Sequence, residues 1–412
     1  MTVDAFSQHP PHPFFGIDDD CLTIGGRRIT DIAAQVGRTP FYAYARTHLS
    51  ERVAALRQIV PAEVHLHYAI KANPMPAVVS HMSRLVDGLD VASALEMQTA
   101  LDCGIEPELI SFAGPGKSVA ELRSAVAAGI VLNVESEREI ERLVAIARDT
   151  ALRPKVAVRV NPDFELKTSG MKMSGGPKQF GIDAERVPGL LMKMRDMPLE
   201  FVGFHIFSGS QNLKAEAIID AQQKAVALGI ELARSAPGPV RTLNIGGGFG
   251  IPYFPGEQPL EVTAIGANLR ELVATVAKAL PGAHLAIELG RYLVGEAGVY
   301  VCKVLDKKIS RGQTFLITDG GLHHHLAASG NFGQVIRKNY PVLIGNRARG
   351  SQREVANVVG PLCTPLDTLA DRMDLAAADV DDLVVVFQSG AYGLTASPHG
   401  FLSHPAPVEI LI

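Results

Sequence analysis

Lys71 is the residue whose type and setting could most readily do covalent chemistry. It follows the apolar run VHLHYAI, which ends at Ile70, and its neighbours are short and uncharged. An apolar setting disfavours the ammonium form, so such a lysine is a candidate nucleophile toward an aldehyde. A solvated lysine at the end of a strand is the ordinary alternative. The other motifs must distinguish the two.

Two later clusters suit a phosphate and an electron-poor ring. NIGGGFG, residues 244–250, contains three consecutive glycines, which let backbone amides approach an anion closely. ELGRYL, residues 288–293, places the carboxylate of Glu288 three residues before Arg291. The glycine run is also similar to a dinucleotide loop, but no acidic residue ends a second strand about twenty residues later.

Together these residues predict pyridoxal phosphate as cofactor. Lys71 would bind its aldehyde, and Glu288 would hold a proton on the pyridine nitrogen so that the ring draws electrons from a substrate α-carbon. A salt bridge between Glu288 and Arg291 is the structural alternative.

The elements that must position these residues alternate along the chain. From Pro40 onward, eight short apolar runs alternate with segments of helical periodicity such as SVAELRSAVAAG. This order predicts a closed parallel (β/α)8 TIM barrel, with function at the carboxyl ends of the strands. The runs end at Ile70, Ala92, Ala113, Val134, Val160, Phe207, Ile245 and Glu288, and polar or glycine residues follow them: Lys71, Ser93, Gly114, Glu135, Asn161, residues 208–211, residues 246–248, Gly290 and Arg291.

The last third of the chain has a different pattern. VYVCKVL, TFLITDG, VANVVG, DLVVVF and PVEILI are β-rich and separated by Gly, Pro and Asp turns. We predict an α/β protein with a barrel over residues 41–294 and a C-terminal β-sandwich or barrel domain over 295–412. The segment 21–40 should join the β-domain, and residues 1–20 should form a flexible arm.

Composition sets broad limits. The 412 residues are 47% hydrophobic and 20% charged, with a formal net charge of -4, so no basic face for nucleic acid is indicated. Four scattered cysteines form no CxxC pair, which argues against a disulfide framework or zinc site. No apolar stretch is long enough to cross a bilayer. We therefore expect a cytoplasmic protein without a membrane or nucleic-acid partner.

Many ordered motifs then resemble one family. YAIKANP, DVASALE, FAGPGK, VAVRVNP, HIFSGSQN, NIGGGFGIPY, ELGRYL, VGPLCTPLD and SGAYG are similar to the pyridoxal-phosphate-dependent decarboxylases of ornithine, lysine, arginine and diaminopimelate, which have the alanine-racemase fold. The resemblance implies that Lys71 forms a Schiff base and that Glu288 contacts the pyridine nitrogen. It places the cofactor among Lys71, Arg159, His205, Phe207, Ser210, Gly247, Gly248, Glu288, Gly290, Arg291 and Tyr392.

The family stacks a histidine on the ring. Here ungapped alignment puts Phe207 at that position and His205 two residues earlier, and the choice stays open, because both would share one face of a strand.

The resemblance also implies that Cys363 returns a proton to the α-carbon. A thiol suits that role because its ordinary pKa lies near neutrality. In the family this cysteine reaches the neighbouring subunit's site, so a homodimer with shared sites is expected, with Lys71, Cys363 and His205 as catalytic candidates. Arg291, Arg337, Tyr340, Thr364 and Tyr392 are the candidate substrate-binding residues.

Substrate identity depends on departures from the family pattern. Thr364 stands where the family carries an acidic residue for the substrate's far ammonium, and an unpaired buried ammonium is costly. Asp367 could compensate by reaching back. HIFSGSQN, DGGLHHHLA and VGPLCTP are closer to a branch that decarboxylates glutamyl groups on an acyl carrier protein, together with exosortase-associated and siderophore decarboxylases. A run of basic residues could receive a carrier or remain a solvated loop: Arg337, Lys338, Arg347, Arg349 and Arg353.

Other interpretations remain. His323, His324 and His325 cannot all face one metal ion from an extended strand, so one is expected to line the pocket and no metal is predicted. We predict a carboxy-lyase acting on an amino acid or carrier-bound amino-acyl group. Diaminopimelate decarboxylase is the first alternative, and a racemase or a non-catalytic regulator is the second.

Overall fold

The computed structural model describes residues 9, 14–166, 170–334 and 337–412. The chain divides into two compact units. We call Arg52–Ile251 with Leu260–Gly290 the barrel unit. The β unit comprises the described residues up to Glu51, together with Pro252–Pro259 and Arg291–Ile412.

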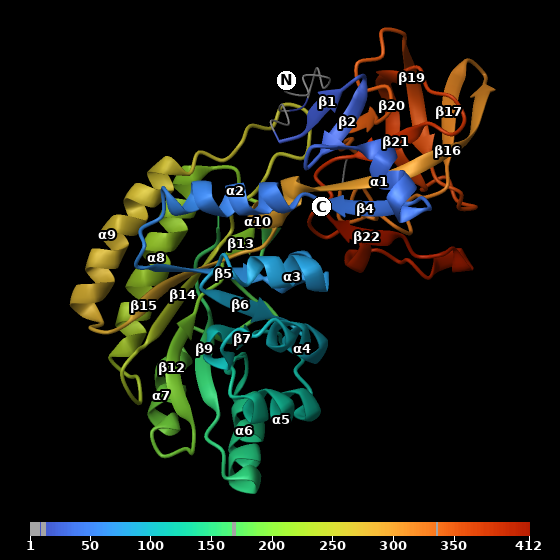
Figure 1. The fold of residues 1–412 in the computed structure, drawn as a ribbon. Helices are drawn as coiled ribbons and strands as arrows, with labels where there is room; N and C mark the ends of the chain where they lie inside the picture. Colours follow the sequence, from blue (N-terminus) through green and yellow to red (C-terminus); the bar gives the residue numbers. More distant parts are fainter. Residues whose placement is uncertain (1–8, 10–13, 167–169, 335–336) are drawn as a thin grey trace. The chain divides into compact units, whose positions relative to one another are not determined.

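The barrel unit is built around a closed ring of parallel strands (Figure 1). Each strand pairs with the next along the chain, and β15 pairs back with β5. The predicted (β/α)8 barrel is therefore confirmed. The ring consists of β5 (Val64–Ala69), β6 (Gly88–Val91), β7 (Ile110–Phe112), β8 (Val131–Val134), β9 (Lys155–Asn161), β12 (Glu200–His205), β14 (Thr242–Gly247) and β15 (His284–Leu289).

Helices cover the outside of this ring, and their sequences explain where they begin. Ser93, Ser118 and Ser136 each accept a hydrogen bond from the N–H three residues later, which satisfies donors that the first helical turn leaves unpaired. The helices are α2 (Arg46–Arg57), α3 (Pro76–Met82), α4 (Ala94–Asp102), α5 (Val119–Ala128), α6 (Glu137–Thr150), α7 (Val187–Met194), α8 (Ala215–Ala233) and α9 (Thr263–Ala279).

Short elements lie among the barrel loops. Strand β11 (Ile182–Asp183) adds to β9, and β10 (Met171–Lys172) pairs with β13 (Gly209–Ser210). Two 3-10 turns, η1 (Ile70–Ala72) and η2 (Pro107–Leu109), follow β5 and precede β7. Because η1 begins where β5 ends, Lys71 lies at the carboxyl end of its strand.

The β unit combines the beginning and the end of the chain. Strand β4 pairs with β16 antiparallel and with β22 parallel, which confirms the β-domain that takes in an N-terminal segment. Its elements are β1 (Gly16–Asp18), β2 (Cys21–Ile24), β3 (Arg27–Arg28), α1 (Ile29–Val36), β4 (Phe41–Tyr44), α10 (Arg291–Val294), η3 (Gly295–Ala297), β16 (Gly298–Ser310), β17 (Gln313–Thr318), β18 (Val342–Ile344), β19 (Arg353–Val359), β20 (Thr368–Ala376), β21 (Leu383–Val386), η4 (Leu394–Ala396), η5 (Phe401–Ser403) and β22 (Val408–Leu411).

The core of the β unit draws on the same distant segments. Phe41, Val301 and Val385 are fully buried in one cluster with Phe15 and Ile24. Most of the predicted N-terminal arm lies outside the described residues, and its last part contains β1 and the buried Phe15.

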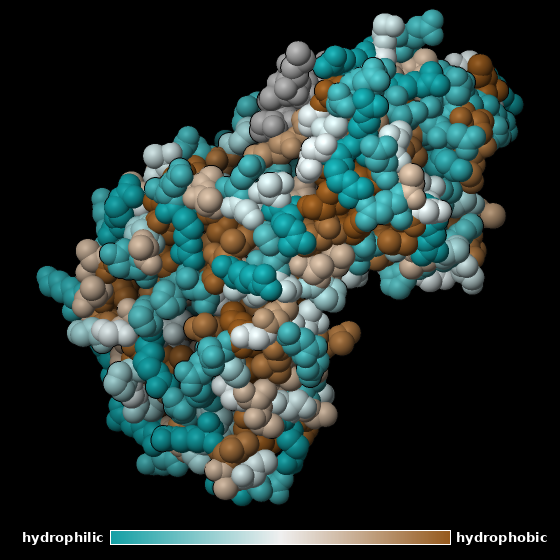
Figure 2. Space-filling model, in the orientation of Figure 1, coloured by the Kyte–Doolittle hydropathy of each residue, from teal (hydrophilic) through white to brown (hydrophobic). Residues whose placement is uncertain are grey.

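On the face shown in Figure 2, hydrophilic side chains are spread over the barrel unit and are interrupted by small apolar patches. In the part of the chain that the structure describes, no helix combines the length and apolarity that a membrane crossing requires.

Candidate active site

A cluster of three polar side chains lies at the carboxyl ends of β5, β12 and β15. Glu288 is buried, and its Oε1 lies 3.4 Å from Lys71 Nζ. Its Oε2 lies 3.1 Å from His205 Nε2. The sequence predicted an apolar pocket around Lys71, but this is wrong in one respect: the lysine side chain is 44% exposed and faces a carboxylate.

The charge of Glu288 is fixed by its neighbours. Burial opposes its ionisation, but Lys71, the hydrogen bond from His205 and the more distant Arg159 outweigh burial and hold the pKa of Glu288 well below its ordinary value. Glu288 is therefore a permanent anion near neutral pH, with one oxygen held by a buried ring and the other directed toward Lys71.

Phe207 and His205 do not share one face as the sequence analysis assumed. Strand β12 ends at His205, so the two-residue alternation stops before Phe207. His205 turns to Glu288, whereas the ring of Phe207 lies 5.5 Å from Lys71 Nζ. The two aromatic residues thus contact different members of the cluster.

Arg159 is held on the neighbouring side of the barrel. Its Nη1 lies 2.7 Å from Glu135 Oε1, and both side chains are buried. Glu135 also accepts hydrogen bonds from the backbone N–H groups of Gly114 and Gly181. Arg159 therefore belongs to a satisfied ion pair that braces three strand-end loops, and its positive charge still acts on Glu288 from a distance.

The glycine run after β14 forms a tight backbone turn. Gly246 and Gly248 have φ values of +67° and +80°, which favour glycine, and Asn244 Oδ1 accepts a hydrogen bond from the N–H of Gly246 at 2.8 Å. A Cβ on Gly247 would collide with the carbonyl oxygen of Glu288. Ser210 ends β13, and Gly290 follows β15 in contact with Ala72.

The β unit contributes a separate aromatic cage around Arg291. Arg291 Nη1 donates to the hydroxyl of Tyr253 at 2.8 Å, and its guanidinium lies 4.5 Å from the ring of Tyr392. The ring of Tyr340 lies 4.7 Å from that of Tyr253. Burial opposes the charge, but these tyrosines outweigh it and raise the pKa of Arg291. Sequence analysis missed Tyr253, although its place just after the glycine run was a signal.

The carboxylate nearest Cys363 in the sequence, Asp367, is engaged by backbone N–H groups. Cys363 is exposed, and Thr364 Oγ1 accepts from the N–H of Leu366 at 3.3 Å. Asp367 is buried, and its two oxygens accept from the N–H groups of Leu322 and Leu362 at 2.6 and 2.8 Å. The expectation that Asp367 could reach back to a substrate is therefore wrong, because this carboxylate clamps its own loop.

The predicted basic patch is largely neutralised. Arg337 donates from its two Nη groups to the backbone carbonyls of Ser329 and Thr368, so it links neighbouring parts of the β unit. Arg347 pairs with Asp382 at 2.8 Å, and Arg353 pairs with Asp374 at 2.9 Å. Two of the five basic residues in the patch are therefore paired with acidic residues distant in the sequence, and a third is held by backbone carbonyls.

The three adjacent histidines lie on a turn, not on an extended strand. His324 Nε2 donates to the carbonyl of Pro405 at 3.0 Å, and His325 Nε2 donates to Ser389 Oγ at 2.9 Å. Burial lowers the pKa of His323 to about 4 and that of His325 to about 3. Among the described residues, no group of three or more His, Cys, Asp or Glu side chains could hold a metal ion.

Two buried polar atoms in these clusters are left for a bound group. Within the described residues, His205 Nδ1 in the barrel unit and Arg291 Nε in the β unit have no hydrogen-bond partner. Unsatisfied buried groups are rare, so they mark places where a ligand completes the network. An amine, an anion, an aromatic ring and a glycine turn are the parts that pyridoxal phosphate requires.

Comparison with known proteins gives the class. Residues 46–295 match the family described as "Pyridoxal-dependent decarboxylase, pyridoxal binding domain". The chain is 37% identical over 379 residues to the L-glutamyl-[BtrI acyl-carrier protein] decarboxylase of Niallia circulans, covering 90% of this chain and 88% of that protein. It is 32% identical to the diaminopimelate decarboxylase of Aquifex aeolicus, covering 97% and 93% of the two chains.

A solved structure agrees with this class. The diaminopimelate decarboxylase of Helicobacter pylori complexed with L-lysine superposes with a TM-score of 0.82 at 26% identity, covering 93% of this chain and 94% of that one. The barrel and the cluster at its strand ends thus define a pyridoxal-phosphate enzyme. The chain belongs to the pyridoxal-dependent decarboxylases and is a carboxy-lyase that uses pyridoxal phosphate.

Proposed function

We propose that this enzyme removes the α-carboxylate of an amino-acyl substrate whose far end is uncharged, such as a glutamyl group on an acyl carrier protein. One observation carries the proposal. Asp367 is buried and bound to two backbone N–H groups, and Thr364 stands where the family resemblance leads us to expect an acidic residue. A far ammonium would find no carboxylate from this loop, whereas a thioester or amide needs none. The carrier-protein relative from Niallia circulans supports the same substrate class.

The barrel residues have distinct roles in this proposal. The bound cofactor supplies an electron-withdrawing ring that accepts the electron pair left when carbon dioxide departs. Lys71 would hold its aldehyde, and Glu288, which stays an anion because its own pKa is depressed, would keep a proton on the ring nitrogen. His205 positions Glu288 through the 3.1 Å contact, and Phe207, whose ring lies near Lys71 Nζ, would be the aromatic residue beside the cofactor ring.

Anion binding is assigned to backbone and guanidinium groups. Gly247 and Gly248 carry no side chain of their own, so we assign their N–H groups to an anion, and Ser210 adds a hydroxyl. Arg291, held by Tyr253 and Tyr392, presents a fixed positive charge to a phosphate or carboxylate. Arg159 acts through its positive charge, which favours the ionised form of Glu288. Its Nη1 is already held by Glu135.

Cys363 returns the proton to the α-carbon in a homodimer with shared sites. Its exposure leaves the thiol accessible to a neighbouring subunit. A proton donor supplied from a second chain makes the isolated subunit catalytically incomplete. Assembly is therefore part of the proposed mechanism.

A carbon dioxide release assay tests the substrate class. Purified enzyme with pyridoxal phosphate is given glutamyl thioester on an acyl carrier protein, glutamyl-pantetheine, and free glutamate, diaminopimelate, lysine, ornithine and arginine. We expect release from the thioesters at least about tenfold above any free diamino acid, because binding an unpaired ammonium costs several kcal/mol. Activity confined to diaminopimelate would instead support the second candidate, which the Aquifex aeolicus relative favours.

A further inference from the structure

The interior of the barrel unit holds a cavity of about 310 Å³ at the end away from Lys71. Its lining includes the first residues of several strands, among them Ile110, Val131, Lys155 and His284. Lys71, by contrast, lies two residues beyond Ala69, the last residue of β5. Barrels of this kind are normally filled by layers of side chains. Here small residues such as Ser111 and Ala157 line the wall and leave space.

Two hydrogen-bond donors of the lining are available to an occupant. His67 Nδ1 lies 3.1 Å from Asp90 Oδ1, which leaves Nε2 as the donor on the other side of the ring. Burial opposes protonation of His67, but Asp90 and Glu288 outweigh it and raise its pKa. Asn244 uses its Oδ1 to accept from Gly246, so its amide NH₂ is the remaining polar group. Neither donor has another partner among the described residues.

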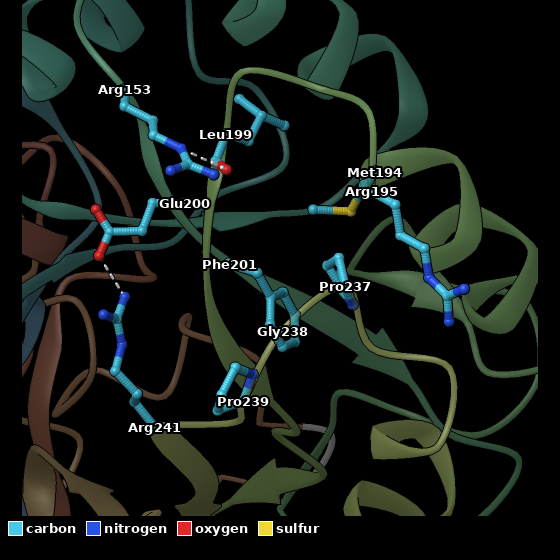
Figure 3. Close-up of a pocket in the computed structure, with 10 residues that line it drawn as sticks. All are labelled: Arg153, Met194, Arg195, Leu199, Glu200, Phe201, Pro237, Gly238, Pro239 and Arg241. Carbon is cyan, nitrogen blue, oxygen red and sulfur yellow. Dashed lines mark hydrogen bonds and ion pairs between the residues drawn. The ribbon is translucent and has the colours of Figure 1, made fainter.

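The acidic residues of the lining are already paired. Glu108 lies 2.6 Å from Lys155, and Glu200 lies 2.5 Å from Arg241. Figure 3 shows the second pair at the start of β12, in an adjoining hollow. A cationic ligand would have to break one of these pairs, whereas an anion finds the donors of His67 and Asn244 unused.

The adjoining hollow is not itself the site. It contains three arginines, but in Figure 3 the guanidinium groups of Arg153 and Arg241 lie on one side and that of Arg195 lies on the other. They do not converge on one anion. The interior cavity differs because its donors lie beside an apolar wall that includes Val131, Val202 and Phe204.

We propose that the interior cavity binds a small monocarboxylic acid with a short aliphatic chain. The carboxylate accepts from His67 Nε2 and the Asn244 amide, and the chain packs along Val131 and Val202. The volume lies at the lower end of the range for ligand pockets, which suits a short acid. His67 and Glu288 are register partners on β5 and β15, so an occupant changes the electrostatic surroundings of the buried Glu288 carboxylate. This site is separate from the one proposed for the substrate.

Isothermal titration calorimetry of the full-length enzyme, as purified with its cofactor, tests the proposal with pentanoate as the probe. Pentylamine and pentanamide have the same chain and serve as controls. We expect one pentanoate per chain, and at least tenfold weaker binding of both controls. Equal binding of pentylamine, or no measurable binding of pentanoate, would overturn the proposal.

Two kinds of variant locate the binding. Ala157→Leu fills the cavity without removing a donor and should abolish the heat of pentanoate binding. Ala157→Val, a smaller change, covers the case in which the leucine variant does not fold, and it should weaken binding by a measurable factor. His67→Gln should weaken pentanoate at least tenfold while leaving the circular dichroism spectrum unchanged. Undiminished binding to a folded Ala157→Leu protein would place the acid elsewhere and refute the assignment.

Discussion

The two units bury polar side chains in opposite ways. In the barrel unit, buried groups at the strand ends are charged and paired: Glu288 with His205 and Lys71, and Glu135 with Arg159. In the β unit, several buried polar side chains are neutral rings, such as Tyr300 and His325. Burial raises the pKa of Tyr300 and lowers that of His325, so both stay uncharged.

This difference distinguishes buried groups that serve a reaction from buried groups that serve packing. Charge in a buried site is expensive and persists only where partners offset desolvation, so paired ions at a barrel mouth indicate function. Neutral rings fill space without the cost of burying a charge. The β unit also buries charged groups where partners offset desolvation: Arg291 lies in its cage of tyrosines, and Asp382 pairs with Arg347.

The largest expected effect comes from the lysine of the barrel unit. Lys71→Ala removes the amine that binds the cofactor aldehyde, so carbon dioxide release should fall on the order of 10³-fold or more. The absorbance band of the covalently bound cofactor should vanish with it. Lys224→Ala is the matched control, because Lys224 pairs with Asp220 on the surface of α8, away from the cluster around Glu288. A variant at Lys71 that keeps both band and activity would refute the assignment.

The next effect tests whether the β unit supplies one catalytic group. Cys363→Ala should lower carbon dioxide release by about 10²- to 10⁴-fold, because general acid catalysis is lost, while the cofactor band stays. Cys103→Ala, on α4 and its cap, is the control and should retain activity. Mixing the Lys71→Ala and Cys363→Ala proteins should restore about a quarter of the wild-type activity, because half of the random dimers carry one complete site. No recovery on mixing would contradict shared sites.

A smaller effect concerns the pH dependence of stability that His325 gives to the β unit. The unfolded histidine has a pKa near 6.5, whereas burial lowers the folded pKa of His325 to about 3. As the pH falls, the histidine is therefore protonated in the unfolded state before it is protonated in the folded state. The free energy of unfolding decreases once the pH is below the unfolded-state pKa, by about 2 kcal/mol at pH 5 for one such group. Urea unfolding at pH 7.5 and pH 5 measures this loss, which His325→Gln should reduce. The exposed His399→Gln should not.

The smallest effect concerns the neutralised patch. Arg353 lies on the surface and pairs with Asp374, so Arg353→Glu should change KM for a carrier-bound substrate by less than about twofold. Arg353→Gln is the isosteric control without charge reversal. A large rise in KM for the carrier-bound form, with no change for glutamyl-pantetheine, would show that this surface receives the carrier after all.

Local pattern was enough to predict the barrel. Each of the eight apolar runs became a strand, because alternation of β-branched runs with amphipathic helices depends on neighbours in the chain. Strand ends were less certain. The expected end at Phe207 was two residues too long, and this hid the different contacts of His205 and Phe207.

Long-range pairing was not predictable. No local pattern predicts that Arg347 pairs with Asp382 or that Arg353 pairs with Asp374. One of the backbone donors to Asp367, the N–H of Leu322, lies 45 residues away in the sequence. Such contacts depend on the register of strands that the pattern alone does not fix. Charge runs and lone carboxylates are therefore the features that sequence analysis overinterprets.

The pairing of β4 with both β16 and β22 has a consequence for synthesis. Phe41–Tyr44 leaves the ribosome before the barrel, but its two partner strands follow some 250 and 360 residues later. The barrel sequence can form its own core during translation. During that time the apolar strand β4 has no partner strands, so its backbone edges stay unpaired. A nascent chain of this enzyme should therefore depend on holding factors until release, and deletion of the final strand should leave a folded barrel attached to an aggregation-prone remnant.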